Sequence, residues 1–139
     1  MRKVVLDVNV IVSGITYSNS VPGALVQLGV DGFFELILSE HILRGVERAW
    51  SKPYFRQRFG EDTLALALGH VRHRSRIIVP DPFVTGVALD DEDDQVIGTA
   101  IAGRADYLVT GDQGLLRLSL FRDVAIMSPR DFLDLLTEN

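Results

Sequence analysis

The sequence predicts a three-layer α/β/α fold, in which helices cover both faces of a central parallel sheet. Short apolar runs that fit buried strands alternate with segments whose apolar residues recur at helical spacing. Start and stop signals for helices separate these segments. Such alternation is typical of parallel strands joined by helical crossovers. With 139 residues the chain can bury a sizeable core, so we expect a single domain over residues 1–139.

The first quarter of the chain predicts the order strand, helix, strand. Residues 3–8 are an apolar run that fits a buried, central strand. A polar turn region over residues 13–20 follows, and Pro22 can open a helix that continues to about Val30. Residues 33–38 fit the second strand.

The helix after the second strand has two distinct sides. Ser39 is suited to cap its start, and Lys52-Pro53 is expected to close it. The spacing predicts a buried face made of Ile42, Leu43, Val46, Ala49 and Trp50. The other side carries His41, Arg48 and Lys52, with Gly45 at its edge.

The middle of the chain continues the alternation. Apolar residues between Leu64 and Val71 predict an amphipathic helix, and residues 77–79 predict a short strand. Five consecutive acids, residues 90–94, then precede apolar residues at helical spacing, and Gly103 supplies a stop. The acids are therefore expected at the start of a helix, where negative charge is favourable.

The last part of the chain predicts two strands and two helices. Residues 107–109 and 124–126 fit buried strands, and a brief helix is expected between them at residues 115–118. Ser128-Pro129 is a strong helix start, because serine suits the cap and proline the first helical position. This final helix is expected to reach about Leu136.

Three aspartates are predicted to meet at one edge of the sheet. Asp7 ends the first strand, Asp93 starts a helix, and Asp112 follows a strand. Functional groups in open α/β sheets gather at the carboxyl ends of the strands. Carboxylates at short range repel one another unless a proton or a cation neutralises them, and Mg²⁺ or Mn²⁺ suits such oxygen ligands. Asp7, on an otherwise apolar strand, is the sharpest single signal, whereas Asp93 and Asp112 taken alone fit structural caps better, so the metal-site hypothesis depends on the convergence of all three.

Composition excludes several classes of site. The chain has no cysteine, which excludes disulfides, thiolate metal sites and cysteine nucleophiles. Asp7 interrupts the first apolar stretch too early for a signal peptide, and no later run is long enough to span a bilayer. We therefore expect a cytoplasmic protein that has no membrane partner.

The formal net charge of −5 argues against a general nucleic-acid binder, but the charge is unevenly distributed. Eight basic and three acidic residues lie between Arg44 and Arg76, so this segment carries +5 and the rest of the chain −10. A basic segment beside an acidic pocket suits an anionic polymer, although solvated helix faces explain the same charges. Arg48 and Lys52 are the first candidates for binding substrate phosphates.

Three motifs in this order resemble those of the PIN domain family, and in particular the toxin subunits of VapC-like toxin–antitoxin pairs. They are Leu6-Asp7-Val8-Asn9, Asp90-x-x-Asp93 before Val96-Ile97-Gly98-Thr99-Ala100, and Leu108-Val109-Thr110-Gly111-Asp112. The resemblance covers nearly the whole chain. It implies a parallel sheet of five strands and an endoribonuclease that hydrolyses RNA phosphodiester bonds with Mg²⁺ or Mn²⁺. It also implies a cognate antitoxin and a homodimer.

The resemblance also implies roles for individual residues. Asp7, Asp93 and Asp112 would be the catalytic, metal-binding acids, and the supporting residues would be Asn9, Asp90 and Thr110. With three acids we expect one tightly held ion and a second that arrives with the substrate.

One position departs from the family pattern. A glutamate is usual six residues after the serine that opens the helix, and Gly45 occupies that position here. Glu40 and Glu47 do not point in the direction of Gly45, because they are displaced from it by about 140° and 200° around the helix axis, respectively. His41 shares the face of Gly45, but Asp91 and Asp94 are the favoured substitutes. The glycine leaves space that a partner segment or a metal-bound water could use.

The missing acid keeps a second function open. A catalytically weak PIN module that binds RNA or a partner protein would tolerate glycine at this position. A phosphatase of the haloacid dehalogenase type is a third interpretation, suggested by Asp7 at the end of the first strand. It would need a second acid where Asn9 stands and a lysine near the later acids, and the only lysines are Lys3 and Lys52, so we set it aside.

Overall fold

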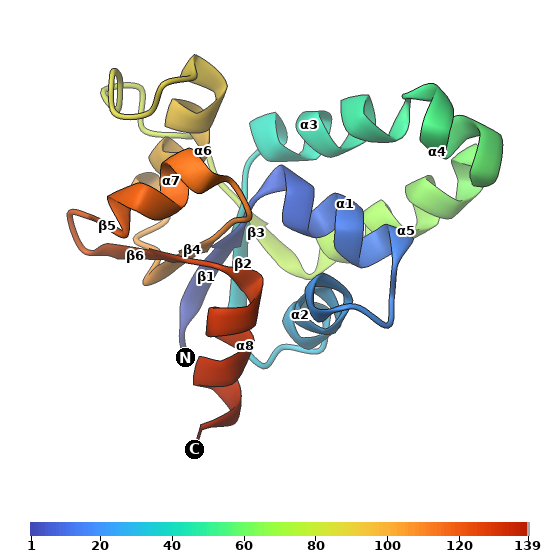
Figure 1. Cartoon of the computed structure of the whole chain (residues 1–139), viewed down its shortest axis with the longest axis horizontal. Coiled ribbons are helices and arrows are strands. Elements are labelled where there is room, and N and C mark those ends of the chain that lie inside the picture. The colour runs from blue at the N-terminus through green and yellow to red at the C-terminus, as the bar shows by residue number, and fades with distance from the viewer. Residues whose placement is uncertain (139) are drawn as a thin grey trace.

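The computed structural model describes residues 1–138 and has a six-stranded sheet between helices (Figure 1). The strands are β1 (Lys3–Leu6), β2 (Glu35–Leu38), β3 (Ser75–Ile77), β4 (Tyr107–Val109), β5 (Leu120–Phe121) and β6 (Val124–Met127). The helices are α1 (Val8–Thr16), α2 (Val21–Val30), α3 (Glu40–Trp50), α4 (Pro53–Arg58), α5 (Glu61–His73), α6 (Asp91–Ala102), α7 (Gln113–Leu118) and α8 (Pro129–Thr137). The strand order is β3-β2-β1-β4-β6-β5, and only the β5–β6 pair is antiparallel.

Two adjacent residues of β2 show that helices cover both faces of the sheet. Successive side chains of a strand point to opposite faces. Leu36 packs against α2 at Gly29, whereas Ile37 packs against the end of α6 at Gly103. Helices α1 and α8 pack in turn on α2. The predicted three-layer α/β/α architecture is therefore confirmed.

The five predicted strands are all present, and the sheet has one more. Strand β3 ends at Ile77 and so lies earlier than the predicted residues 77–79. The additional strand, β5, pairs with β6 at the edge of the sheet. Its two residues are too few to show a period, and the left-handed backbone at Ser119 and Arg122, with φ of 53° and 51°, encloses it without the glycines that usually mark such turns.

The largest difference from the sequence prediction is α1. We expected a strand to residue 8 and a turn over residues 13–20, but β1 ends at Leu6 and α1 follows it. The β-branched residues of α1 have low helix propensity, which is only a weak predictor. Burial decides the conformation here, because Val10 and Ile11 belong to the core and α1 packs on both α2 and α3.

Helix α3 starts and ends as predicted. Ser39 Oγ accepts a hydrogen bond from the Ile42 backbone N–H (3.4 Å) and so caps the helix. The helix ends at Trp50 with Ser51 as its C-cap, directly before Lys52-Pro53, and Pro53 then opens a further helix, α4, which the sequence did not predict. Proline is favoured at the first helical position, where no N–H is needed. Lys52 therefore lies at the junction of two helices.

The later elements follow the prediction closely. Helix α6 starts after the cap Asp90 and ends at Gly103. Helix α7 begins before the expected Leu115 with Asp112 as its cap, and Ser128 caps α8 as predicted. Within residues 1–138, no helix combines the length and the apolar character needed to cross a bilayer.

The sheet register places two of the predicted acids beside each other. Leu6 of β1 pairs with Val109 of β4, so these parallel strands end at the same level. The Asp7 backbone N–H extends the pairing by donating to the Val109 carbonyl oxygen (2.9 Å). Residues that follow the two strands therefore meet at one edge of the sheet.

Candidate active site

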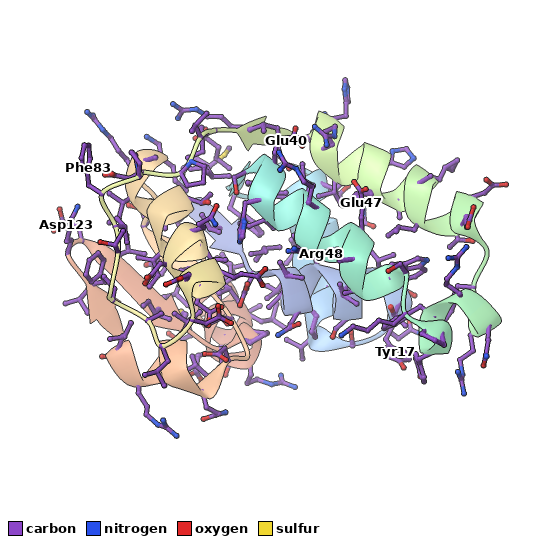
Figure 2. All side chains as sticks on the ribbon, turned by 90° about the horizontal axis from the view of Figure 1, so that it is seen from above. Tyr17, Glu40, Glu47, Arg48, Phe83 and Asp123 are labelled. Carbon is purple, nitrogen blue, oxygen red and sulfur yellow. The ribbon has the colours of Figure 1, made fainter. Side chains whose placement is uncertain are left out.

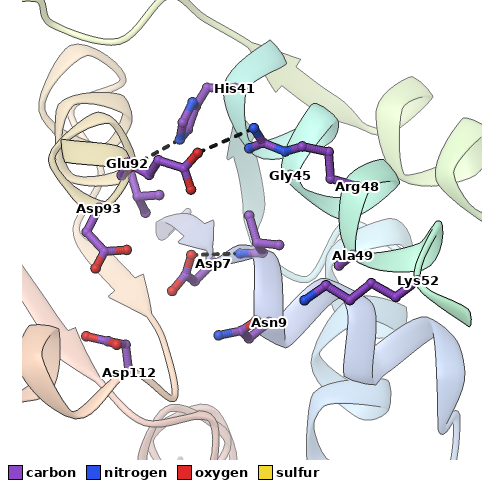
Figure 3. Close-up of a pocket in the computed structure, with 12 residues that line it drawn as sticks. Asp7, Asn9, His41, Gly45, Arg48, Ala49, Lys52, Glu92, Asp93 and Asp112 are labelled. Carbon is purple, nitrogen blue, oxygen red and sulfur yellow. Dashed lines mark hydrogen bonds and ion pairs between the residues drawn. The ribbon is translucent and has the colours of Figure 1, made fainter. Parts of the chain in front are cut away.

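A cavity of about 450 Å³ opens at the carboxyl ends of β1 and β4 (Figure 3). The start of α1, one side of α3, the first turn of α6 and the residue before α7 contribute to its walls. Six predicted site residues line it: Asp7, Asn9, Arg48, Lys52, Asp93 and Asp112. The fold thus brings together side chains that lie far apart in the sequence.

Asp7 is the deepest acid of the cavity, with 5% of its surface exposed. Its Oδ1 accepts a hydrogen bond from the Val8 N–H (2.7 Å), and its Oδ2 accepts one from Thr110 Oγ1 (2.7 Å). Thr110 Oγ1 in turn accepts from the Asp112 N–H (3.0 Å). Burial raises the pKa of Asp7, and the two hydrogen bonds oppose that rise. Thr110 therefore fixes one acid and the backbone of another.

Asp93 and Asp112 face the same space from other elements (Figure 3). Asp112 caps α7, because its Oδ2 accepts from the Leu115 N–H (2.8 Å). Asp93 lies in the first turn of α6, and its N–H donates to the Asp90 carbonyl oxygen (3.1 Å). Burial raises the pKa of Asp93 to about 6, with further contributions from the charges of Asp112 and Asp7. The three carboxylates are thus close enough to repel one another.

The predicted supporting residues lie around these acids. Asn9 lines the cavity, and Thr110 is fully buried behind it. Asp90 lines a neighbouring hollow that it shares with Asp93 and Asp112, and its Oδ1 accepts from the Glu92 N–H (2.9 Å). Asp90 therefore shapes the start of α6 rather than the cavity itself.

The acids suit a hard divalent cation in ligand type and in charge. All three offer carboxylate oxygens, and the charges of Asp112 and Asp7, which add to burial in raising the pKa of Asp93, are negative charge that a cation would neutralise. Within residues 1–138, however, no three His, Asp or Glu side chains are drawn together as a ready set of ligands. Asp7 and Asp112 direct oxygens at protein donors instead, although each such oxygen keeps a second lone pair.

Gly45 lines the cavity, but the position that its Cβ would take is filled by Val8. The residue is buried in α3, where α3 crosses the start of α1. A Cβ atom at Gly45 would lie 2.7 Å from Cγ2 of Val8, well inside van der Waals contact. The side chain of Val8 thus occupies the place where a longer side chain on α3 would begin.

Neither acid that we expected to replace the missing glutamate does so. Asp94 is buried, and its carboxylate accepts hydrogen bonds from the backbone N–H groups of Gly86 (2.9 Å), Val87 (3.1 Å) and Ala88 (2.7 Å). It anchors the loop before α6. Asp91 is exposed and does not line the cavity.

Glu92 also lines the cavity, and its side chain stays largely exposed to solvent. Its carboxylate lies 3.3 Å from Nη1 of Arg48, and its carbonyl oxygen accepts a hydrogen bond from Nε2 of His41 (3.1 Å). Seen from above, α3 and α6 lie side by side, with Arg48 on the α3 side of the space between them (Figure 2). No sequence pattern marks Glu92, because both of its partners lie on another helix.

Most arginines between Arg44 and Arg76 bind other residues outside the cavity. Arg56 pairs with Glu61, Arg72 with Glu40 and Arg76 with Glu35. Arg58 stacks on the ring of Tyr54, and Arg74 donates to the Val30 carbonyl oxygen. Arg48 and Lys52 are the basic residues of the segment that line the cavity. The solvated-face interpretation therefore holds for the remainder.

Asp94→Ala is expected to lower the free energy of unfolding by about 2–4 kcal/mol, because it leaves three backbone N–H groups without their acceptor. Urea denaturation measures the change. The matched control is Asp91→Ala in the same helical turn, which is exposed and should change the value by less than about 0.5 kcal/mol. Equal stability of the two variants would exclude the anchoring role.

Asp93→Asn is expected to stabilise the protein in EDTA at pH 8 more than at pH 4.5. The pKa of Asp93 is raised from 3.8 to about 6 in the folded state, so folding favours its protonated form. Its contribution to stability is therefore fully present below pH 3.8 and is lost as the pH rises through 6. The asparagine side chain has no carboxyl group to ionise, so the variant does not lose this stability at high pH. Thermal unfolding of variant and wild type at both pH values measures the effect. If the gain in Tm of the variant over wild type is the same at pH 4.5 and pH 8, the prediction is wrong.

Comparison with known proteins agrees with this architecture. The model of the PIN domain family matches residues 3–114. A protein of Methanocaldococcus jannaschii described as uncharacterized is 26% identical over 116 residues, covering 84% of this chain and 74% of that protein. A chain in the crystal structure of VapBC2 from Rickettsia felis, bound to a DNA fragment from its promoter, superimposes with a TM-score of 0.64 and 17% identity. The match covers 91% of this chain and 98% of that one.

The structural likeness, at that identity, concerns the fold. The family match is more specific, because it spans both β1, which leads to Asp7, and the residues around Asp112. It also covers most of the chain. The chain therefore belongs to the PIN domain family.

Proposed function

We propose that this protein is a metal-dependent endoribonuclease that hydrolyses RNA phosphodiester bonds and acts as the toxin of a type II toxin–antitoxin pair. The observation that carries the proposal is the cavity that Asp7, Asp93 and Asp112 line from three different elements. Membership of the PIN domain family supports it. The roles of these residues as metal-binding acids are part of the proposal.

The three aspartates would hold Mg²⁺ or Mn²⁺, which polarises a phosphate and lowers the pKa of a bound water. Thr110 keeps Asp7 in position through its hydroxyl hydrogen bond. Asn9 offers an amide to a water or a phosphate oxygen at the same wall. Arg48 and Lys52 add positive charge for the RNA backbone. No nucleophilic side chain is required.

The toxin assignment includes partners. The likeness in fold to a chain of VapBC2, a complex solved on promoter DNA, supports a cognate antitoxin. We propose that this chain likewise binds an antitoxin and forms a homodimer. Coexpression with a candidate antitoxin tests the pairing, because a true antitoxin should copurify and suppress RNA cleavage.

The nuclease proposal is tested by calorimetric titration with Mn²⁺ and by cleavage of a single-stranded RNA. Wild-type protein should bind Mn²⁺ and cleave RNA in a reaction that EDTA stops. Asp93→Asn should weaken Mn²⁺ binding by at least about tenfold, because it removes a charged ligand. Equal Mn²⁺ affinity of the two proteins, or cleavage that persists in EDTA, contradicts the proposal.

The α3 side of the cavity favours one alternative. It carries no acid, so the protein could be a catalytically weak PIN module that acts through RNA or protein binding. That function predicts RNA binding by wild-type protein with no Mn²⁺-dependent cleavage, and the same two measurements distinguish it.

A further inference from the structure

The two sides of the cavity carry opposite charges. Four acids stand on the side formed by α1, α6 and the start of α7: Asp7, Glu92, Asp93 and Asp112. The α3 side contributes no carboxylate and brings Arg48 and Lys52 instead (Figure 3). A divalent cation with carboxylate ligands is therefore confined to one side.

Packing keeps the middle of α3 free of a side chain that could bind the ion, and the imidazole of His41, which lines the cavity from the start of α3, directs its Nε2 at the Glu92 carbonyl oxygen. Val8 contacts the backbone of α3 at Gly45 so closely that even a Cβ atom there would meet Cγ2 of Val8 at 2.7 Å. The contact joins the first turn of α1 to the middle of α3. The middle of α3 thus faces the cavity without a side chain, and the charge on this side comes from the residues that follow.

Arg48 and Lys52 differ in whether they form an ion pair. Arg48 already pairs with Glu92 across the cavity (3.3 Å). Lys52 makes no ion pair with any residue in the range 1–138, and Figure 3 shows its ammonium group reaching into the cavity toward Asn9. Lys52 is thus the cation that remains available to a phosphate.

The backbone of Lys52 is held firmly at the junction of α3 and α4. Its N–H donates to the Ala49 carbonyl oxygen (3.3 Å), and its carbonyl oxygen accepts from the N–H groups of Phe55 (3.0 Å) and Arg56 (3.1 Å). Stacking of Trp50 on Phe55, with ring centroids 5.2 Å apart, fastens the two helices together. The flexible stem of Lys52 therefore projects from a fixed point beside the cavity.

On these grounds we propose that the cavity takes one divalent ion, at Asp7, Asp93 and Asp112, and that the Lys52 ammonium binds the scissile phosphate on the α3 side in place of a second ion. The inference rests on the proposed nuclease function. It replaces the expectation that the substrate brings a second ion.

The charges of the cavity do not require a second ion. Three ionised aspartates and one divalent ion leave a formal charge of −1, Lys52 brings the protein side to zero, and a bound phosphodiester returns the total to −1, while Arg48 and Glu92 carry opposite charges. In hydrolysis a water oxygen bonds to phosphorus and the bond to the leaving oxygen breaks. One water proton ends on the leaving oxygen, and the other stays with the phosphate monoester or passes to solvent. Lys52 stays protonated throughout and only binds the phosphate oxygens.

The test measures the number of bound Mn²⁺ ions by calorimetry, with and without adenosine 5′-monophosphate as a phosphate probe. We expect one ion per chain in both titrations. Lys52→Met should keep that number and the Mn²⁺ affinity, bind the nucleotide at least about tenfold more weakly, and cleave RNA about a hundredfold more slowly. Lys52→Arg should recover part of the loss. Arg56→Met, a basic residue of α4 outside the cavity, is the matched control and should match wild type.

The outcomes separate this inference from the proposed function. Two Mn²⁺ ions per chain, or wild-type cleavage and nucleotide affinity in Lys52→Met, overturn the single-ion inference and leave the nuclease function standing. A wild-type protein that neither binds Mn²⁺ nor cleaves RNA overturns the nuclease function, and the inference falls with it.

Discussion

Asp7→Asn is expected to lower Mn²⁺-dependent RNA cleavage by about a thousandfold or more while the protein stays folded. The substitution removes the most buried carboxylate of the cavity and keeps its shape. The asparagine oxygen can still accept from the Val8 N–H, and asparagine is as good a helix cap as aspartate. The amide nitrogen can donate to Thr110 Oγ1, so the contact between the ends of β1 and β4 is kept with donor and acceptor exchanged.

Thermal unfolding in EDTA separates loss of function from loss of structure. Burial raises the pKa of Asp7, so the folded state at neutral pH contains a carboxylate whose charge is disfavoured there. The neutral amide should therefore unfold at the same temperature or a higher one. Asp91→Asn, at an exposed acid that does not line the cavity, serves as the control for removing one negative charge. Undiminished cleavage by Asp7→Asn would remove Asp7 from the mechanism.

Elements with strong end signals were predictable from the sequence. Helix α6 lies between Asp90 and Gly103 as expected, and Ser128 starts α8, because capping depends on local hydrogen bonds. Helix α1 was missed for the opposite reason. Its local sequence favours strand, and only packing on α2 and α3 makes it a helix. Secondary structure that is decided by distant contacts does not appear in a local pattern.

The position of the cavity was also predictable. Parallel strands end at one edge of a sheet, so acids at the ends of β1 and β4 must lie near each other once the strands pair. The contacts of single side chains were not predictable. The packing of Val8 on Gly45, the pairing of Glu92 with Arg48 and the loop anchor at Asp94 all join residues whose proximity depends on the full fold.

Gly45→Glu is expected to lower the free energy of unfolding by about 1–2 kcal/mol and to bring no gain in cleavage. Its Cβ would clash with the stiff, β-branched side chain of Val8, which cannot rotate away without leaving its rotamer. Replacing glycine in a helix gains only about 1 kcal/mol, which does not offset that overpacking. Urea denaturation in EDTA measures the loss. Gly45→Ala is the control that isolates the first added carbon.

Combining Gly45→Glu with Val8→Ala should recover most of the lost stability, because the alanine vacates the space that the new side chain needs. The two substitutions are then strongly non-additive, and a double-mutant cycle gives the coupling energy of the Val8–Gly45 contact directly. The double variant also adds a carboxylate to the α3 side of the cavity, so Mn²⁺ titration should show a second bound ion beside the first. Full stability of Gly45→Glu alone, or simple additivity in the cycle, would show that Val8 does not determine which side chain α3 can carry at this position.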